Sequence, residues 1–314
     1  MEKLSYAEST NMSYGRRRTR QELRTVAQAL PFVLPGLILV CVFILYPMLK
    51  NIQISLSEYK IVEGKMDFVG FDNYKELFTE PQRRFWYAYR NNILYAVVTT
   101  PAIMLFGLIF AAMINSMKKN QVFFRTMYYL PVITSWIIVG LVFKYLFNGG
   151  NRGMVNYFLV DVLHLAPDYI NWLKHEWTGN FVIWLLGIWK NTGWAMVIYL
   201  AGLQGIPNEL YESADMEGAN AFQKFTKITF LLLKPTHFFL IVQLLIGSFN
   251  VFLQVLVLTG GDPQGRTSVL QYLLYDRSFS LFEFGQGAAI GLVTGISIFI
   301  VTVILNKFLR SEQY

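Results

Sequence analysis

Six long apolar stretches limit what this chain can fold into. They cover residues 31–56, 91–114, 127–147, 180–204, 237–259 and 287–309. A helix that crosses the hydrocarbon core of a bilayer needs about 20 predominantly apolar residues. Charged residues make up 15% of the chain, whereas soluble domains carry about 25%. The sequence therefore predicts an all-α polytopic membrane protein with about six transmembrane helices.

Three of these stretches contain residues that are unusual in a spanning helix. Pro101 lies inside the second stretch and Pro131 inside the third, while Lys190 and Asn191 lie inside the fourth. Proline is tolerated there because neighbouring helices can satisfy the carbonyl that it frees. We expect the third and fourth spans to face protein or a water-filled path, and Pro131 to kink the third.

The charge distribution predicts the orientation of the chain. The first apolar stretch is too long for a signal peptide and is preceded by about thirty residues. The basic cluster Arg16, Arg17, Arg18 and Arg20 lies before it, and such clusters stay in the cytoplasm. We therefore expect both termini in the cytoplasm, a cytoplasmic tail over 1–29 and one transmembrane domain over 30–314.

The residue content argues against several functions. Cys41 is the single cysteine and the three histidines are scattered, so we expect neither a disulfide within the chain nor a metal site. The net charge of +7 forms no stripe, which argues against nucleic acid as a partner. Motifs of hydrolases, metalloproteases and P-loop ATPases are absent from the sequence, so we expect no catalytic residues and no cofactor.

The loop between the fourth and fifth spans, residues 205–235, has the features of a helical hairpin. Pro207 and Glu209 suit the first turn of a helix. Gly218 can end that helix in a left-handed conformation, and Asn220 with Gln223 has the pattern of a capping box that starts a second helix.

This loop resembles the EAA loop of bacterial ABC importer permeases. Glu212, Ala214, Gly218 and Ile228 match the spacing E-x-A-x3-G-x9-I. The family pattern then ends I-x-L-P, whereas proline follows here only at Pro235. In that family the loop forms the coupling helix, which docks in a groove of the cytoplasmic ATPase. The resemblance implies ATPase-coupling roles for these residues: Glu212, Ala214, Asp215, Gly218 and Ile228.

Similarity to carbohydrate importers extends over most of the chain. LPFVLPGLILVCVFILYPML, FVGFDNYKELF, YYLPVITSW and TGGDPQGRTSVLQYLLYDRSF resemble permeases related to the larger membrane subunit of the maltose importer. The resemblance implies the type I importer fold in a bacterial cytoplasmic (inner) membrane. It also implies four kinds of partner: a second, non-identical permease, two ATPase subunits that bind ATP and Mg, an extracytoplasmic solute-binding protein, and a saccharide.

Polar and aromatic side chains on three spans suit a saccharide, because sugars have apolar faces and hydroxyl edges. From the residues and the resemblance together, we expect the substrate path at Ser135, Trp136, Lys190, Asn191, Trp194, Gly247 and Asn250. An ammonium within the bilayer is costly, so Lys190 should face the bundle interior or water. It either pairs with an acidic sugar or reaches the membrane interface through its flexible stem.

Other classes of protein share parts of this pattern. A secondary transporter usually has intramembrane carboxylates for coupling ions, and none of the six stretches contains an acidic residue. A membrane-embedded enzyme would need a clustered catalytic set. ABC permeases for amino acids, peptides or sugar phosphates share the loop, and the opening segment with the Trp-rich fourth span favours sugar over them.

Overall fold

The computed structural model describes residues 28–60, 64–117 and 119–310. The basic cluster Arg16–Arg20 and nearly all of the predicted tail 1–29 lie outside the described residues. The chain divides into two units, Met1–Ile54 and Ser55–Tyr314. In the first unit an apolar helix, Gln28–Ser55, runs to the boundary and includes α2 (Tyr46–Ser55). Its 28 residues rise about 42 Å, which is enough for the first predicted span.

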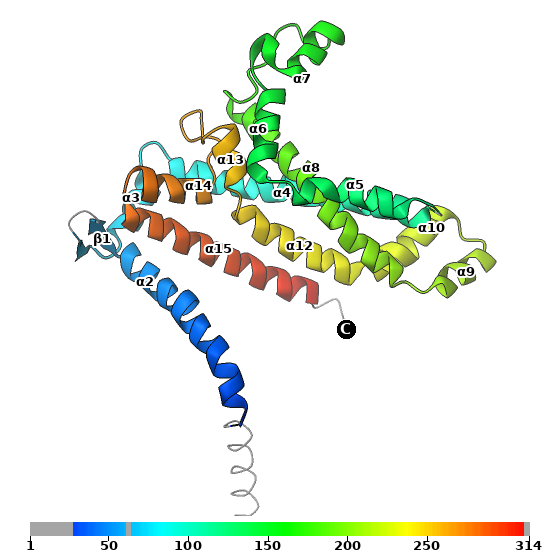
Figure 1. Ribbon diagram of the computed structural model, residues 1–314, viewed down its shortest axis with the longest axis horizontal. Coiled ribbons are helices and arrows are strands. Elements are labelled where there is room, and N and C mark those ends of the chain that lie inside the picture. The colour runs from blue at the N-terminus through cyan, green and yellow to red at the C-terminus, as the bar shows by residue number, and fades with distance from the viewer. Residues whose placement is uncertain (1–27, 61–63, 118, 311–314) are drawn as a thin grey trace, which may run out of the picture. The chain divides into compact units, whose positions relative to one another are not determined.

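Three long helices form the frame of the second unit: α4 (Arg84–Ser116), α8 (Glu176–Gln204) and α15 (Phe284–Arg310). Each is long and apolar enough to cross a membrane, which confirms the second, fourth and sixth predicted spans. Figure 1 shows these three helices together with α12 (Lys234–Phe249), which also belongs to the second unit. Pro101 lies inside α4 without interrupting it.

Small residues allow α4 and α8 to pack closely. A Cβ atom on Gly107 of α4 would lie 2.8 Å from the Cβ of Ala195 on α8. Gly187 on α8 faces the phenol of Tyr95 on α4, and a Cβ atom there would overlap it. Close approach at glycine and alanine is typical of helix contacts inside membranes, where dispersion forces replace the hydrophobic effect.

The third predicted span is broken. It consists of α5 (Gln121–Ile133) and α6 (Trp136–Leu146), which meet at an angle of 91°. Pro131 lies shortly before the break, and proline removes a backbone hydrogen bond and crowds the preceding turn. The third predicted span is therefore present as a bent pair of helices, and the expected kink near Pro131 is confirmed.

The fifth predicted span also differs from the prediction. Its helix α12 ends at Phe249, and the chain continues without helix from Asn250 before α13 (Leu253–Leu258) begins. The amide of Asn250 donates to the carbonyl of Ile246, and such side-chain bonds compete with continued helix. The expectation of a continuous helix to residue 259 was therefore wrong. On the other side of α12, the helical segment Ala221–Leu232 meets it at 63°.

The remaining elements are short. The strands β1 (Ser57–Lys60) and β2 (Lys65–Phe68) pair antiparallel and were not predicted. The segment FDNYKELF forms α3 (Asp72–Thr79). After α6 come the 3-10 turn Gly150–Arg152, α7 (Met154–Asn156) and the π-helical turn Tyr157–Val162. Before α15 come α14 (Leu270–Tyr275) and a π-helical turn, Asp276–Ser280.

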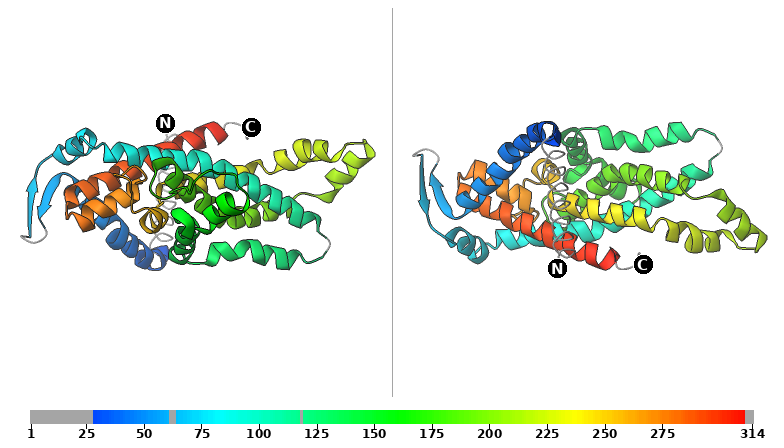
Figure 2. Two further views of the ribbon diagram at one scale, coloured as in Figure 1. Left: turned by 90° about the horizontal axis from the view of Figure 1, so that it is seen from above. Right: turned by 90° about the horizontal axis from the view of Figure 1, so that it is seen from below.

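The predicted hairpin is present at one end of the second unit. It consists of α9 (Asn208–Met216), a turn, α10 (Ala221–Lys224), the π-helical turn Phe225–Thr229 and α11 (Phe230–Leu232). Figure 2 shows it at the end of the unit opposite the β1–β2 strand pair.

Candidate functional site

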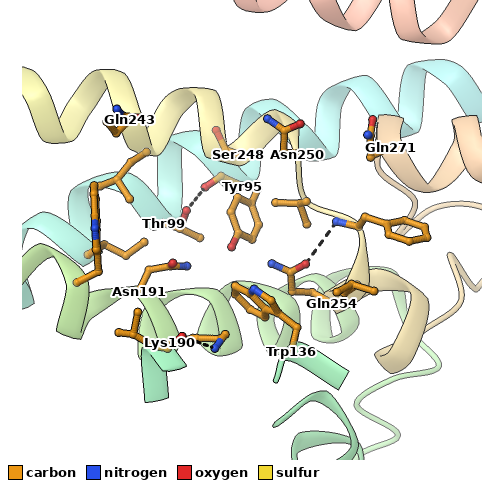
Figure 3. Close-up of a pocket in the computed structure, with 18 residues that line it drawn as sticks. Tyr95, Thr99, Trp136, Lys190, Asn191, Gln243, Ser248, Asn250, Gln254 and Gln271 are labelled. Carbon is orange, nitrogen blue, oxygen red and sulfur yellow. Dashed lines mark hydrogen bonds between the residues drawn. The ribbon is translucent and has the colours of Figure 1, made fainter. Parts of the chain in front are cut away.

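A cavity of about 680 Å³ lies within the second unit, bounded by α4, α8, α12 and the segment that follows α12. It is lined by aromatic, amide and hydroxyl groups set among aliphatic side chains (Figure 3). A few placed polar groups in a largely apolar wall are typical of binding sites for small molecules. The polar and aromatic lining residues are Tyr95, Thr99, Trp136, Lys190, Asn191, Trp194, Gln243, Ser248, Asn250, Phe252, Gln254 and Gln271.

The cavity brings together nearly all of the residues that the sequence proposes for a substrate path. Trp136, Lys190, Asn191, Trp194, Gly247 and Asn250 line it. Ser135 lies at the break between α5 and α6, exposed and outside the lining. Whether these residues bind substrate stays a prediction, but the fold does place residues from three distant segments around one space.

The amides around the cavity keep hydrogen-bonding capacity. Asn191 donates to the carbonyl of Gly187 at 2.9 Å, and Asn250 donates to that of Ile246 at 3.0 Å. Each amide has a second N–H and an acceptor oxygen beyond this one bond. The side chain of Gln243 makes no hydrogen bond to any described residue of the chain. The lining can therefore offer both donors and acceptors to a ligand with many hydroxyls.

Several lining residues were missed from the sequence. Tyr95 and Thr99 lie on α4, and Gln271 lies on α14. Figure 3 shows Tyr95 pointing towards Gln254 across the cavity. The signal was weak, because Tyr95 and Thr99 stand in an apolar run and their spacing of four is ordinary for a helix. The sequence does not say whether the face of α4 that carries Tyr95 and Thr99 lies against lipid or in the interior, because that depends on how α8 packs against α4.

Lys190 lies in the interior of the bundle, with 3% of its surface exposed. Its Nζ donates to the carbonyls of Pro131, Val132 and Thr134 at 2.7, 3.2 and 2.6 Å. It also lies 4.8 Å from the centroid of the Trp136 ring. The expectation that Lys190 faces the interior is confirmed, and the interface alternative is wrong. Pairing with an acidic sugar stays a prediction. In this structure the donors of the ammonium are directed at the three backbone carbonyls.

Two adjacent asparagines on α4 hold the chain segments around the cavity. Asn92 donates to the carbonyl of Ser248 at 2.7 Å and accepts from the amide of Leu270 at 2.8 Å. Asn91 donates to the carbonyls of Arg266 and Ser268 at 2.7 and 2.8 Å. Two contacts reach the last turn of α12 and the first residue of α14, and two reach the irregular segment before α14, so α4 fixes the position of all three.

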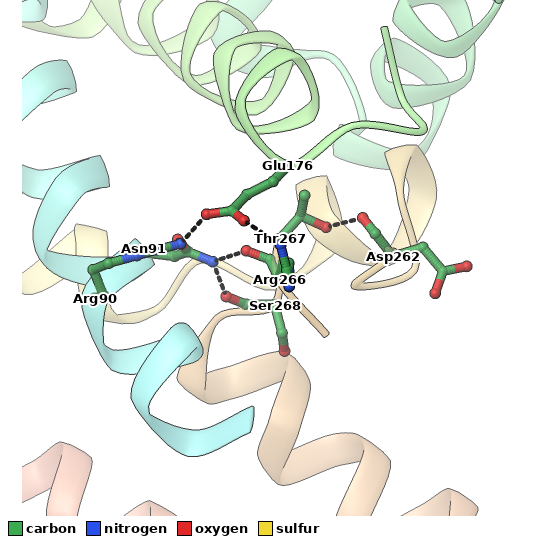
Figure 4. A network of polar contacts seen from close by, with 7 residues as sticks. All are labelled: Arg90, Asn91, Glu176, Asp262, Arg266, Thr267 and Ser268. Carbon is green, nitrogen blue, oxygen red and sulfur yellow. Dashed lines mark hydrogen bonds and ion pairs between the residues drawn. The ribbon is translucent and has the colours of Figure 1, made fainter. Parts of the chain in front are cut away.

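Charged side chains strengthen this attachment (Figure 4). Glu176, in the first turn of α8, pairs with Arg90 of α4 at 2.5 Å and with Arg266 at 3.5 Å. Thr267 donates to the carbonyl of Asp262 at 2.6 Å. The cluster thus joins α4, α8 and the segment between α13 and α14 at one end of the cavity-forming helices.

A second ion cluster is centred on the buried side chain of Arg277. Arg277 pairs with Glu80 at 2.5 Å and with Glu283 at 2.8 Å. Burial alone would lower the pKa of the Arg277 guanidinium, but the two carboxylates outweigh it and raise that pKa. Arg277 therefore stays charged and connects the segment after α3 to the start of α15.

The hairpin has the local structure that the sequence predicts. Gly218 has φ +75° and ends α9, and Asn220 and Gln223 form a capping box at the start of α10. Lys224 on α10 pairs with Asp215 on α9 at 2.7 Å. Tyr211 shares a hydrogen bond of 2.9 Å with Thr229. These contacts hold the two arms of the hairpin together.

The predicted coupling residues occupy two different settings. Glu212, Asp215 and Gly218 are exposed, and Ala214 is partly buried. Ile228 packs against the core cluster shared by α4 and α8. Met216 is 90% exposed at the end of α9. The hairpin therefore presents one face outward while its other face is anchored to the long helices.

Taken together, several spanning helices, a polar cavity among them and an anchored exposed hairpin define a multi-pass membrane protein of the transport type. Among the described residues no three His, Cys, Asp or Glu side chains come together as a metal site would require. Residues 103–311 match the family model described as the inner membrane component of binding-protein-dependent transport systems. The chain belongs to this family of ABC transporter permeases.

Relatives align over nearly the full chain. The arabinooligosaccharides transport system permease protein AraP of Bacillus subtilis is 35% identical over 279 residues, covering 88% of this chain and 85% of AraP. The trehalose/maltose transport system permease protein MalF of Thermococcus litoralis is 31% identical over 281 residues, covering 90% and 93%.

A solved structure shares the fold. It is a chain of a bacterial ABC transporter involved in the import of the acidic polysaccharide alginate, with a TM-score of 0.79 and 23% identity. The match covers 95% of this chain and 100% of that one. The type I importer architecture expected from the sequence is therefore the observed one.

Proposed function

We propose that this chain is one permease subunit of an ATP-driven importer for an oligosaccharide in the bacterial cytoplasmic membrane. Its partners are a second, non-identical permease, two ATPase subunits that bind ATP and Mg, and an extracytoplasmic solute-binding protein. Both termini lie in the cytoplasm in this proposal, and the hairpin at 205–235 faces the ATPases. Similarity to permeases named for oligosaccharide and disaccharide transport supports it.

The cavity carries the proposal of a sugar substrate. Trp136 and Trp194 offer flat apolar faces, while Asn191, Asn250 and Gln243 offer amide groups. Sugars need both, because their ring faces are apolar and their edges are hydroxyls. A fold-sharing transporter has been solved with an alginate pentasaccharide-bound periplasmic protein, which supports delivery of an oligosaccharide by such a partner.

The hairpin carries the proposal of ATP coupling. Its exposed face holds Glu212 and Asp215, and Ile228 anchors it to the core of the α4–α8 pair. A shift imposed on the hairpin by closing ATPases would therefore move these helices as a rigid body. Coupling of this kind needs two global states and contacts that differ between them.

The test is reconstitution of the complete complex in proteoliposomes with its solute-binding protein. We expect uptake of an oligosaccharide that requires ATP. Glu212→Arg should abolish substrate-stimulated ATPase activity while the complex still purifies, because it reverses a charge on the docking face. Asp168→Arg, on the exposed segment before α8, makes the same charge change away from the hairpin and should retain activity.

Other outcomes would redirect the assignment. If the complex takes up an amino acid, a peptide or a sugar phosphate but no oligosaccharide, the assignment as an ABC permease stands and the proposed substrate is wrong. Transport by the purified chain without a nucleotide-hydrolysing subunit would overturn the coupling role of the hairpin. Normal uptake in Glu212→Arg would overturn the role of that residue.

A further inference from the structure

Among the described residues that line the cavity, Lys190 is the one with a charged side chain, and its surroundings suggest a role other than ligand binding. An ammonium group carries three N–H donors. The three carbonyls of Pro131, Val132 and Thr134 lie within 3.2 Å of Nζ. In the described structure every proton of this group can therefore be directed at the backbone of the broken span.

Two of these carbonyls, those of Pro131 and Val132, lie at the end of α5. The last four carbonyls of any helix have no acceptor role within the helix, and α5 ends at Ile133. The carbonyls of Pro131 and Val132 belong to that last turn, and that of Pro131 also accepts from the Thr134 hydroxyl at 2.6 Å. Unsatisfied backbone groups within a bilayer cost several kcal/mol each, and the C-terminal end of a helix attracts positive charge. A buried ammonium meets both requirements.

The same ammonium also contacts the residue that follows the break, Trp136. Trp136 is the first residue of α6, its ring lies 4.8 Å from Nζ, and it lines the cavity. A cation over an aromatic face is attracted by the ring quadrupole. Lys190 thus contacts the end of α5, the linking residue Thr134 and the start of α6, on both sides of the 91° bend.

We propose that Lys190 is a positioning residue for transport: its ammonium caps the broken α5–α6 span and holds Trp136 in the cavity wall. The effect of Lys190 on uptake rests on the proposed function. Its effect on the stability of the broken span does not. Lys190 does not provide a free charge for an acidic substrate. Removal of its side chain leaves a cradle of three carbonyl oxygens that accepts a small ammonium ion from solution.

The experiment uses the complete complex with Lys190→Ala, assayed with and without methylammonium or ethylammonium. We expect uptake to fall at least tenfold in the variant and to recover several-fold with either amine. Tetramethylammonium at the same ionic strength has no N–H donors and should restore nothing. Lys144→Ala, an exposed lysine on α6, is the matched control and should show neither loss nor amine dependence.

A second readout separates positioning from charge recognition. If Lys190 acts through the bend, the KM values for a neutral and an acidic oligosaccharide change by the same factor in Lys190→Ala. A rise in KM confined to the acidic oligosaccharide would overturn the proposal. Absence of amine recovery in an assembled complex would also overturn it.

Stability measurements keep the proposal testable if transport itself fails. If the wild-type complex moves no saccharide, the proposed function is at fault, and the midpoint of thermal unfolding is measured instead. The midpoint of Lys190→Ala should rise with methylammonium, whereas the wild-type midpoint should not. If Lys190→Ala does not assemble, methylammonium during purification should restore assembly. Failure of that restoration would refute the cradle.

Discussion

Gly247 gives a sharp test of the cavity because its surroundings are open. It lies on α12 and lines the cavity, and a Cβ atom there would meet no neighbouring described atom within 4 Å. Gly247→Ala therefore adds a methyl group without collision and should stabilise the helix by up to about 1 kcal/mol. Gly247→Trp places a large side chain in the space that we assign to the substrate.

The expected loss can be estimated from the contacts that a displaced sugar would forgo. If the new indole displaces the sugar from two lining amides, at about 1 kcal/mol for each hydrogen bond, binding weakens by about 2 kcal/mol. That corresponds to a roughly thirtyfold loss of affinity, since about 1.4 kcal/mol is tenfold. Uptake at subsaturating substrate in proteoliposomes should fall accordingly for Gly247→Trp and stay near wild type for Gly247→Ala.

The control is Gly295→Trp on α15. A Cβ atom at Gly295 also meets open space, but Gly295 does not line the cavity. Its uptake should stay within about twofold of wild type, which corresponds to a free-energy change of less than about 0.5 kcal/mol. Thermal unfolding of each complex checks that the subunits remain assembled. Wild-type uptake by an assembled Gly247→Trp complex would refute the assignment of this cavity to the substrate.

Two further predictions concern the supporting structure. Asn220→Ala removes the capping box that Asn220 forms with Gln223 and should destabilise the hairpin by about 1 kcal/mol; faster amide hydrogen exchange over 208–224 would show it, and unchanged exchange would contradict it. Arg277→Met leaves Glu80 and Glu283 without their buried partner and should cost about 3 kcal/mol, seen as a lower unfolding midpoint. Adding Glu80→Gln to Arg277→Met should recover part of that loss. If the losses of the two single variants simply add up in the double variant, the Arg277–Glu80 pair contributes nothing.

The sequence predicts the features that depend on local chemistry. Span length alone identifies α4, α8 and α15, because each keeps an apolar run of sufficient length. The hairpin follows from Gly218 and from the Asn220–Gln223 spacing, and both take the predicted conformations. Signals of this kind lie within a few residues of one another, so no tertiary contact is needed to interpret them.

The breaks in the spans could be predicted only in part. Pro131 indicates a kink but not its angle of 91°, since the bend is held by Lys190 of another helix. The end of α12 at Phe249 has a local partner in Asn250 and a distant one in Asn92 of α4, which donates to the carbonyl of Ser248. Lys190 and Asn92 lie far away in sequence from these breaks, and a single sequence contains no record of such pairings.

The interrupted helix at Asn250 has a consequence for how this transporter can diversify. Where a helix stops, main-chain groups lose their intrahelical partners, and side-chain replacement cannot remove them. A wall that includes such a stretch adds main-chain groups to the lining, some of them bonded to Asn92 and Asn250, while neighbouring amides and indoles can vary. Exchanges at Gln243 or Trp194 could thus retune selectivity without disturbing the glycine-mediated contact of α4 with α8, so new specificities should evolve through few substitutions.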